Sequence, residues 1–242
     1  ACVTRRPFSP HGEVALQEAS ILFSDIRNFT TAAERLSVTK VAQILAEYFQ
    51  RACAVAERHG GHHIKVLGDG RMVVFDDATP DLPLKHAVRA LFVALKLAEA
   101  AREFRHWLDT WFARRDLPPF AIGAGVHCGG VMFGRLGSHR AAEETALGDA
   151  VNTTARIETV SKDLGWTAVA NSEPLARAGK GFAVGRTAHA HICGRSNRVT
   201  VAEITGLSDA HFAFKGVAAP WAWIERIQEA IHENTALAAQ PG

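Results

Sequence analysis

The sequence predicts an α/β fold of the α+β sandwich type, with a ferredoxin-like βαββαβ core, a central mostly antiparallel sheet, and extra C-terminal strands and a helix. Three patterns support this prediction. An apolar run at about 20–25 indicates a first strand, a helical pattern covers 38–59, and a hairpin pattern at 62–76 leads into a second helical pattern at 84–112. With 242 residues, of which 48% are hydrophobic, the chain can bury a full core.

The first predicted strand ends in a negative charge. Its apolar run leads directly into Asp25. A carboxylate at the end of a buried strand must be paired or must bind a cation, because burying a lone charge is costly. A second carboxylate, Asp69, stands at the Gly-Asp-Gly tip of the predicted hairpin. If the two strands are neighbours, the two carboxylates face each other, and together they predict a Mg²⁺ site.

Two long helices are predicted from apolar residues at helical spacing. The first covers 38–59 and ends at Gly60-Gly61, and Thr30 and Thr31 are candidate caps for a helix that directly follows the first strand. The second runs from Leu84 to about Phe112, after a polar loop with two prolines. The apolar stripes contain Val41, Ile44, Leu45, Tyr48, Phe49 and Ala52 in the first helix, and Leu84, Val88, Leu91, Leu95 and Ala98 in the second.

The second half of the chain supplies the rest of the sheet. Residues 120–134 are apolar and glycine-rich, which predicts two strands joined by a tight turn at Gly129-Gly130. A further strand is expected to end at Gly148, and Asp149 is the expected cap of the next helix. Smaller strands are predicted at about 166–170, 181–186 and 198–204, and the tail predicts a packing helix through Trp221, Ile224, Ile227 and Ile231.

Composition argues against several classes of function. The formal net charge is +2 at pH 7, so no strong field favours nucleic acid or an anionic membrane as a partner. The 4 cysteines stand far apart without a C-x-x-C pair, as expected for free thiols in a reducing compartment. A reducing compartment predicts a cytoplasmic domain. No apolar run is long enough to span a bilayer.

Four sequence blocks carry a resemblance to a known family. They are F-S-D-I-x-x-F-T at 23–30, I-K-V-L-G-D-G at 64–70, G-V-H-C-G at 125–129 and G-D-A-V-N-x-x-A-R-I-E at 148–158. In this order they resemble the class III nucleotidyl cyclase catalytic domain. The resemblance implies an adenylate cyclase, a lyase that converts ATP into 3′,5′-cyclic AMP and pyrophosphate for signal transduction.

The resemblance also assigns roles to residues. Asp25, Asp69 and the backbone carbonyl of Ile26 would bind two Mg²⁺ or Mn²⁺ ions per site, which agrees with the carboxylate pattern. Asn152 and Arg156, four residues apart on one helix face, resemble the residues that orient the ribose and stabilise charge on the pentavalent phosphate. The triphosphate would be held by turn amides around Asn28, Phe29 and Thr30.

Base selection is assigned to two residues. Lys65 resembles the purine-reading lysine, and Thr145 stands where many cyclases have Asp. Guanylyl cyclases resemble one another in having Glu and Cys at these places, so the Lys/Thr pair favours ATP. Thr at this place also resembles the class IIIb-like subgroup, which bicarbonate often stimulates.

The resemblance implies a head-to-tail homodimer with two shared sites. In it, Asp25 and Asp69 of one subunit would meet the other four side chains, those of Lys65, Thr145, Asn152 and Arg156, from its partner. We expect three regions, namely a lead-in at 1–18, the catalytic domain at 19–205 and a C-terminal helical extension at 206–242. The chain opens on Ala1 without a starting Met, which predicts a piece of a longer protein with a regulatory or membrane domain upstream.

Two departures from the family pattern concern the triphosphate. Many members have a basic residue just before the G-V-H block, where this chain has Ile122 and Gly123. A family lysine near the last strand is replaced by Cys193-Gly194, and Arg195 or Arg198 is the candidate substitute.

Other interpretations remain open from the sequence. His59, His62 and His63 have no carboxylate companion nearby, which favours a surface or packing role over a metal cluster. A diguanylate cyclase would need a G-G-D/E-E-F turn, which is absent. A guanylyl cyclase is the enzymatic alternative. A catalytically silent regulatory domain is the other alternative, but it would lack at least one of Asp25, Asp69, Asn152 and Arg156, and all four are present.

Overall fold

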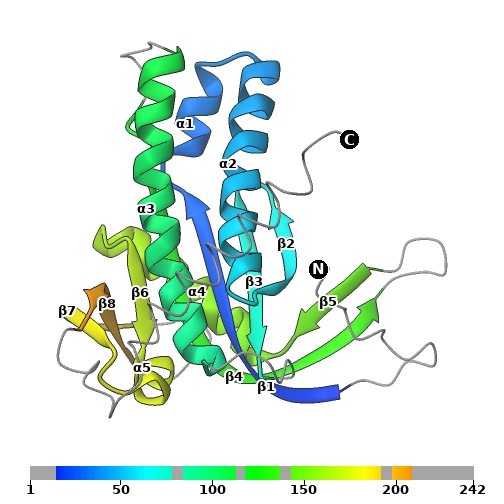
Figure 1. Cartoon of the computed structure of the whole chain (residues 1–242), viewed down its shortest axis with the longest axis vertical. Coiled ribbons are helices and arrows are strands. Elements are labelled where there is room, and N and C mark those ends of the chain that lie inside the picture. The colour runs from blue at the N-terminus through cyan, green and yellow to red at the C-terminus, as the bar shows by residue number, and fades with distance from the viewer. Residues whose placement is uncertain (1–14, 78–83, 113–117, 137–142, 192–197, 209–242) are drawn as a thin grey trace, which may run out of the picture.

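The computed structural model describes residues 15–77, 84–112, 118–136, 143–191 and 198–208. They form one eight-stranded sheet with helices on both faces, so the predicted α/β sandwich with a mostly antiparallel sheet is confirmed (Figure 1). In chain order the elements are β1 (Ala15–Ile26), α1 (Phe29–Glu34), α2 (Val38–Arg58), β2 (His62–Leu67), β3 (Gly70–Asp76), α3 (His86–Phe112), β4 (Ile122–Leu136), β5 (Glu143–Leu147), α4 (Asp149–Leu164), β6 (Ala168–Asn171), α5 (Ser172–Ala178), β7 (Phe182–Ala190) and β8 (Val199–Leu207).

Strand β1 is the centre of the ferredoxin-like core. The strand order is β2-β3-β1-β4-β6-β8-β7, and β5 pairs with β4. β1 pairs antiparallel with both β3 and β4, and among the described strands only β4 and β6 run parallel. These registers place Asp25 directly opposite Gly70 of β3 and Gly123 of β4.

The alternation of side chains in β1 divides the protein into two cores. Leu22 and Ile26 face the large core beneath α2 and α3, whereas Ile21 faces a second core that includes Ala150 of α4. Asp25 lies on the same face as Ile21, because side chains alternate along a strand. Figure 1 shows α2 and α3 side by side, while β4 and β5 extend to one side as an arm.

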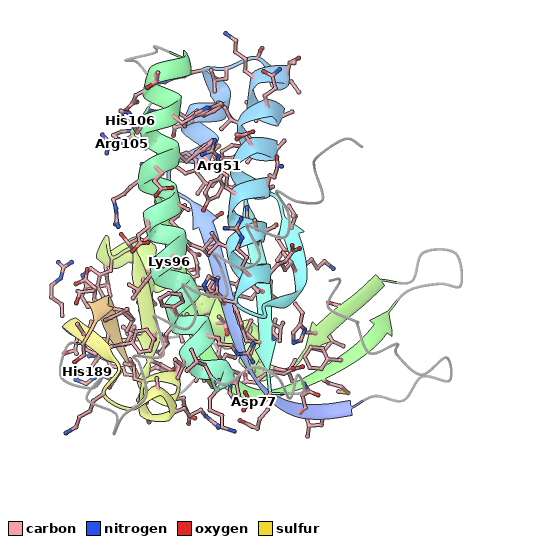
Figure 2. The ribbon with its side chains drawn as sticks, in the orientation of Figure 1. Arg51, Asp77, Lys96, Arg105, His106 and His189 are labelled. Carbon is pink, nitrogen blue, oxygen red and sulfur yellow. The ribbon has the colours of Figure 1, made fainter. Side chains whose placement is uncertain are left out.

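Aromatic rings fill the contact between α2 and α3. The buried Tyr48 ring lies with its centre 5.4 Å from that of Phe104. Arg51, which Figure 2 labels between the two helices, pairs with Glu47 at 2.8 Å, and its guanidinium lies 5.6 Å from the centres of both the Phe104 and Trp107 rings. The two helices therefore cover one face of the sheet as a single packed layer.

The two strands expected over 120–134 are in fact one strand. β4 runs from Ile122 to Leu136, and Gly129 and Gly130 continue its pairing with β1, opposite Ala19 and Glu18. A Cβ on Gly129 would lie 3.0 Å from the Cβ of Ala150 in α4. Gly129 therefore allows a helix to approach the strand, and the predicted turn was wrong.

Two helices begin at residues other than those expected. α1 begins at Phe29, with Asn28 as its N-cap in a left-handed conformation (φ 53°, ψ 26°), so Thr30 lies inside the helix. α4 begins at Asp149, and Gly148 is the N-cap with φ 146°. Asp149 therefore supplies a negative charge to the first turn, where it is favourable, and does not cap the helix.

Other boundaries also differ from the expected ones. β1 begins at Ala15, before the expected start near 20, because its first residues pair with β4 alone. The short helix α5, from Ser172 to Ala178, was not expected. The tail helix predicted through Trp221 lies outside the described residues. Among the residues that are described, no helix is long and apolar enough to cross a membrane.

Candidate active site

Asp25 and Asp69 lie together at one end of the sheet. Asp25 is the residue before the end of β1, and Asp69 lies in the turn between β2 and β3. Asp25 Oδ1 is so close to this hairpin that a Cβ on Gly70 would lie 3.1 Å from it. The pKa of Asp25 is raised above its ordinary value, first by burial and then by the negative charge of Asp69. A cation at this place would relieve both effects.

These two residues fit a divalent-metal site. Carboxylate and carbonyl oxygens are the ligands that Mg²⁺ prefers, and Mg²⁺ keeps several waters and binds substrate phosphates alongside one or two carboxylates. In the described part of the chain, no three His, Cys, Asp or Glu side chains gather as a metal-binding group. The protein ligands in the predicted site would be Asp25, Asp69 and the carbonyl of Ile26, which follows Asp25 in β1.

Glu158 is an acidic neighbour that the sequence did not single out. It lies on α4, on the sheet face to which Asp25 points, and its pKa is raised to about 7, first by burial and then by the charge of Asp25. Its Oε1 atom is buried without a hydrogen-bond partner. Glu158 is the last residue of the 148–158 sequence block, but only the packing of α4 against the sheet shows that it lies near Asp25.

Arg27 is a second residue that sequence reasoning missed. It follows β1, and its backbone N–H donates to Ala121 O at 2.8 Å. Its Nη2 donates to Ser161 Oγ at 2.9 Å and to Trp166 O at 3.1 Å. Arg27 thus connects the turn after Asp25 to the C-terminal end of α4.

The close approach of α4 to β4 depends on a glycine. A Cβ on Gly125 would lie 2.5 Å from the backbone N of Glu158 and 2.8 Å from its Cα. No larger residue fits at this position without moving the helix. The contact fixes how far α4 stands from the strand beside β1.

Asn152 lies on the face of α4 that is turned away from the sheet, and Arg156 lies on the flank of the helix opposite Glu158. Asn152 is exposed and Arg156 is half-buried, while Thr153, Thr154 and Ile157 are buried. An α-helix turns about 100° per residue, so Arg156 projects roughly 200° around the axis from Glu158. Within one chain, Arg156 and Asp25 are therefore not brought together.

Lys65 and Thr145 lie on two strands that contact each other without pairing. Lys65 is in β2 opposite Met72, and Thr145 is in β5 opposite Gly134. β2 and β5 contact each other, and both side chains are half-buried. The strands that carry the two predicted base-selecting residues therefore contact each other, although they are not paired in the sheet.

The remaining predicted residues are spread over the surface or the core. Asn28 is exposed in the β1–α1 turn, Thr30 is exposed in the first turn of α1, and Phe29 packs against the large core. Arg198 is exposed just before β8, and Arg195 lies outside the described residues. Of the histidines, His59 is buried with its Nδ1 2.7 Å from Val55 O, as a packing role predicts. His62 Nε2 lies 3.1 Å from Asp76 Oδ2, so the expectation that the histidines have no carboxylate companion was wrong for His62.

Comparison with known proteins agrees with this geometry. Residues 13–205 match the sequence model of the adenylate and guanylate cyclase catalytic domain. The chain is 30% identical over 154 residues to an adenylate cyclase of Anabaena cylindrica, covering 64% of this chain and 29% of the relative. It is also 30% identical over 193 residues to adenylate cyclase 1 of Rhizobium meliloti (strain 1021), covering 79% of this chain and 28% of the relative. The match therefore spans less than a third of either relative.

Solved structures show the same fold. The guanylyl cyclase Cya2 superposes with a TM-score of 0.71 at 26% identity, covering 85% of this chain and 98% of that structure. The adenylyl cyclase CyaB from P. aeruginosa superposes with a TM-score of 0.72 at 23% identity, covering 81% and 98%. By sequence and by fold, the chain belongs to the family of adenylate and guanylate cyclase catalytic domains.

Proposed function

We propose that this domain is an adenylate cyclase, which converts ATP into 3′,5′-cyclic AMP and pyrophosphate. The observation that carries the proposal is the meeting of Asp25 and Asp69 at the end of β1, where burial and mutual repulsion favour a cation. Both residues stand in the blocks that match the cyclase family. The ribose 3′-hydroxyl of the substrate would attack the α-phosphorus, and pyrophosphate would leave.

The chain's own residues hold the substrate and its charge. Asp25, Asp69 and the Ile26 carbonyl would bind two Mg²⁺ or Mn²⁺ ions, which when bound supply Lewis-acid activation of the attacking and leaving oxygens. Turn amides around Asn28, Phe29 and Thr30 would bind triphosphate oxygens, because the first N–H groups of a helix have no intrahelical acceptor.

On α4, Asn152 would orient the ribose and Arg156 would stabilise the charge that develops on the phosphorus. Arg suits this role because its planar guanidinium stays charged and bonds two oxygens at once. Asn152 is exposed and Arg156 is half-buried, so both keep surface that a nucleotide could contact.

Lys65 and Thr145 support ATP as the substrate. A lysine donates to adenine N1, and a threonine hydroxyl accepts from the adenine amino group. The contact between β2 and β5 supports the proposal that both side chains reach one base edge. GTP is the runner-up substrate, since relatives of both kinds are similar to this chain, among them the human guanylyl cyclase C at 29% identity over 150 residues, 61% of this chain and 13% of that relative.

We also propose that the active unit is a head-to-tail homodimer. Arg156 lies on the flank of α4 opposite Glu158, the residue of this helix that faces Asp25, so we expect a complete site to need Arg156 from a partner. Exposed apolar side chains on β2, β4 and β5 offer a surface for that partner, namely Val66, Leu67, Met132 and Leu147. We further propose that bicarbonate stimulates the enzyme. The domain would lie in the cytoplasm, with a regulatory or membrane domain upstream of it.

The test is an assay of the purified chain with ATP, GTP and Mn²⁺. Cyclic AMP and pyrophosphate should form, and Asp25→Asn or Asp69→Asn should abolish turnover, because each removes an anionic ligand from the metal site. Asp109→Asn, which changes an exposed carboxylate on α3, is the matched control and should keep its activity. If Asp25→Asn keeps most of the rate, the metal assignment is wrong; if GTP is the better substrate, the guanylyl alternative replaces the proposal.

A further inference from the structure

The guanidinium of Arg27 lies over Gly123, beside the candidate metal site. Gly123 is the residue of β4 directly opposite Asp25. A Cβ built on Gly123 would lie 2.2 Å from Arg27 Nη2 and 2.5 Å from Arg27 Cζ. The space that a side chain at position 123 would fill is therefore taken by a cation from the β1–α1 turn.

The two terminal nitrogens of this guanidinium differ in their hydrogen bonds. Nη2 donates to Ser161 Oγ and Trp166 O, which fixes the plane of the group. Nη1 is buried and has no hydrogen-bond partner. A buried charged donor without an acceptor is costly, so this atom is suited to an acceptor that arrives from outside the protein.

The charged groups around Arg27 indicate what kind of acceptor could bind Nη1. Carboxylates are the charges that act on Arg27, in the order Glu158, Asp25 and Asp163, but Glu158 Oε1 is itself buried without a partner. Asp25 is engaged at the metal site in the proposed function. An anion that approaches from the metal site would supply an acceptor for Nη1, and phosphate oxygens match the fork of a guanidinium.

We propose that Arg27 binds the triphosphate of the substrate, with Nη1 donating to a phosphate oxygen. The guanidinium lies over Gly123, a position at which β4 itself has no basic side chain. The proposal rests on the proposed function and adds to it one residue outside the set predicted from the sequence. It also accounts for the glycine at 123, because any side chain there would displace the guanidinium.

Binding of inorganic pyrophosphate with Mn²⁺, measured by calorimetry, tests this without requiring turnover. A hydrogen bond from a charged donor is strong enough that Arg27→Ala should weaken pyrophosphate binding by roughly 10- to 100-fold. Arg27→Lys keeps the charge and should retain more affinity than Arg27→Gln. The matched control is Lys162→Ala, which removes an exposed cation of α4 that also acts on Asp25 and should change affinity less than threefold.

A double-mutant cycle tests whether Arg27 acts from its position over Gly123. Gly123→Ala should weaken pyrophosphate binding when Arg27 is present, because the new methyl displaces the guanidinium, and should add little to Arg27→Ala. The contact of the methyl with Ser161 Oγ, at 2.7 Å, is common to both backgrounds and cancels in the cycle.

The outcomes separate this inference from the proposed function. If Arg27→Ala lowers the melting temperature but leaves pyrophosphate affinity unchanged, Arg27 only joins the β1–α1 turn to α4 and the inference fails. Additive effects in the cycle would also overturn it. If pyrophosphate binding depends on Arg27 but no cyclic nucleotide forms, the inference stands and the proposed activity fails.

Discussion

The ionised form of Glu158 destabilises the folded state. Burial and the neighbouring Asp25 raise its pKa to about 7 from an ordinary value of 4.5. Between these two values the folded protein keeps a proton on Glu158 that the unfolded chain releases. The free energy of unfolding should therefore fall as the pH rises through this window and level off above pH 7.

Glu158→Gln should remove this pH dependence in the metal-free protein. The side chain is part-exposed, so we expect the wild type to lose roughly 1–3 kcal/mol of stability between pH 5 and 8 from this group, and the variant to lose less. Urea unfolding at four pH values measures the difference. The control is Glu173→Gln, at an exposed glutamate of α5. Equal slopes for wild type and Glu158→Gln would contradict the assignment.

Lys65 and Thr145 can be tested as a pair. Replacing them by Glu and Cys reverses the donor and acceptor that face the base edge, so the ratio of kcat/KM for ATP to that for GTP should fall by about tenfold or more. The ratio is measured for the wild type, the double variant and Lys40→Glu, which changes an exposed lysine of α2. An unchanged ratio in the double variant would show that the base is selected elsewhere.

At the scale of single residues, the sequence predicted those whose signal is local. Asp25 and Asp69 each interrupt an apolar strand pattern, and their meeting needed only the assumption that two strands are neighbours. Arg27 and Glu158 gave no such signal, because their positions depend on the rotation of α4 and on its distance from β4. Those quantities are set by packing between elements far apart in the chain.

Among the elements, the contact between β4 and α4 shows why glycine patterns are ambiguous. Gly129 and Gly130 predicted a turn, yet both lie inside a continuous strand. A glycine in a strand marks either a reversal of the chain or the close approach of another backbone. The sequence contains no information that separates the two, whereas the helical periods of α2 and α3 were long enough to be interpreted correctly.

Gly125→Ala should be much more harmful than Gly130→Ala. At 125 the new Cβ meets backbone atoms of Glu158 at 2.5 and 2.8 Å, whereas at 130 it meets only the side chain of Leu16 at 3.5 Å. Backbone atoms of a packed helix cannot rotate away, so we expect Gly125→Ala to destabilise the fold by roughly 1–3 kcal/mol. Urea unfolding and cyclase rates of both variants measure this. Equal stability of the two would mean that α4 can shift freely.

For the whole molecule, the order of elements was predictable, but the direction in which each side chain of α4 points was not. The ferredoxin-like core follows from strand, helix and hairpin patterns along the chain. That α4 carries Glu158 toward Asp25 and Arg156 away from it follows only from the packed structure. This division of one helix into two faces is the physical reason to expect that a complete site needs a second copy of the chain.

Complementation between two inactive variants tests this arrangement. In a head-to-tail dimer, Asp25→Asn and Arg156→Ala damage different halves of each shared site, so a mixed dimer has one site with both wild-type halves and one with both defects. Random exchange makes about half the dimers mixed, so activity should recover to about a quarter of the wild-type level, while each variant alone stays near zero. A mixture of Asp25→Asn with Asp69→Asn is the matched control and should not recover, because both changes damage the same half. If the first mixture stays inactive, a co-expressed heterodimer with two different tags distinguishes slow exchange from sites contained within one chain. An inactive tagged heterodimer would contradict the shared site.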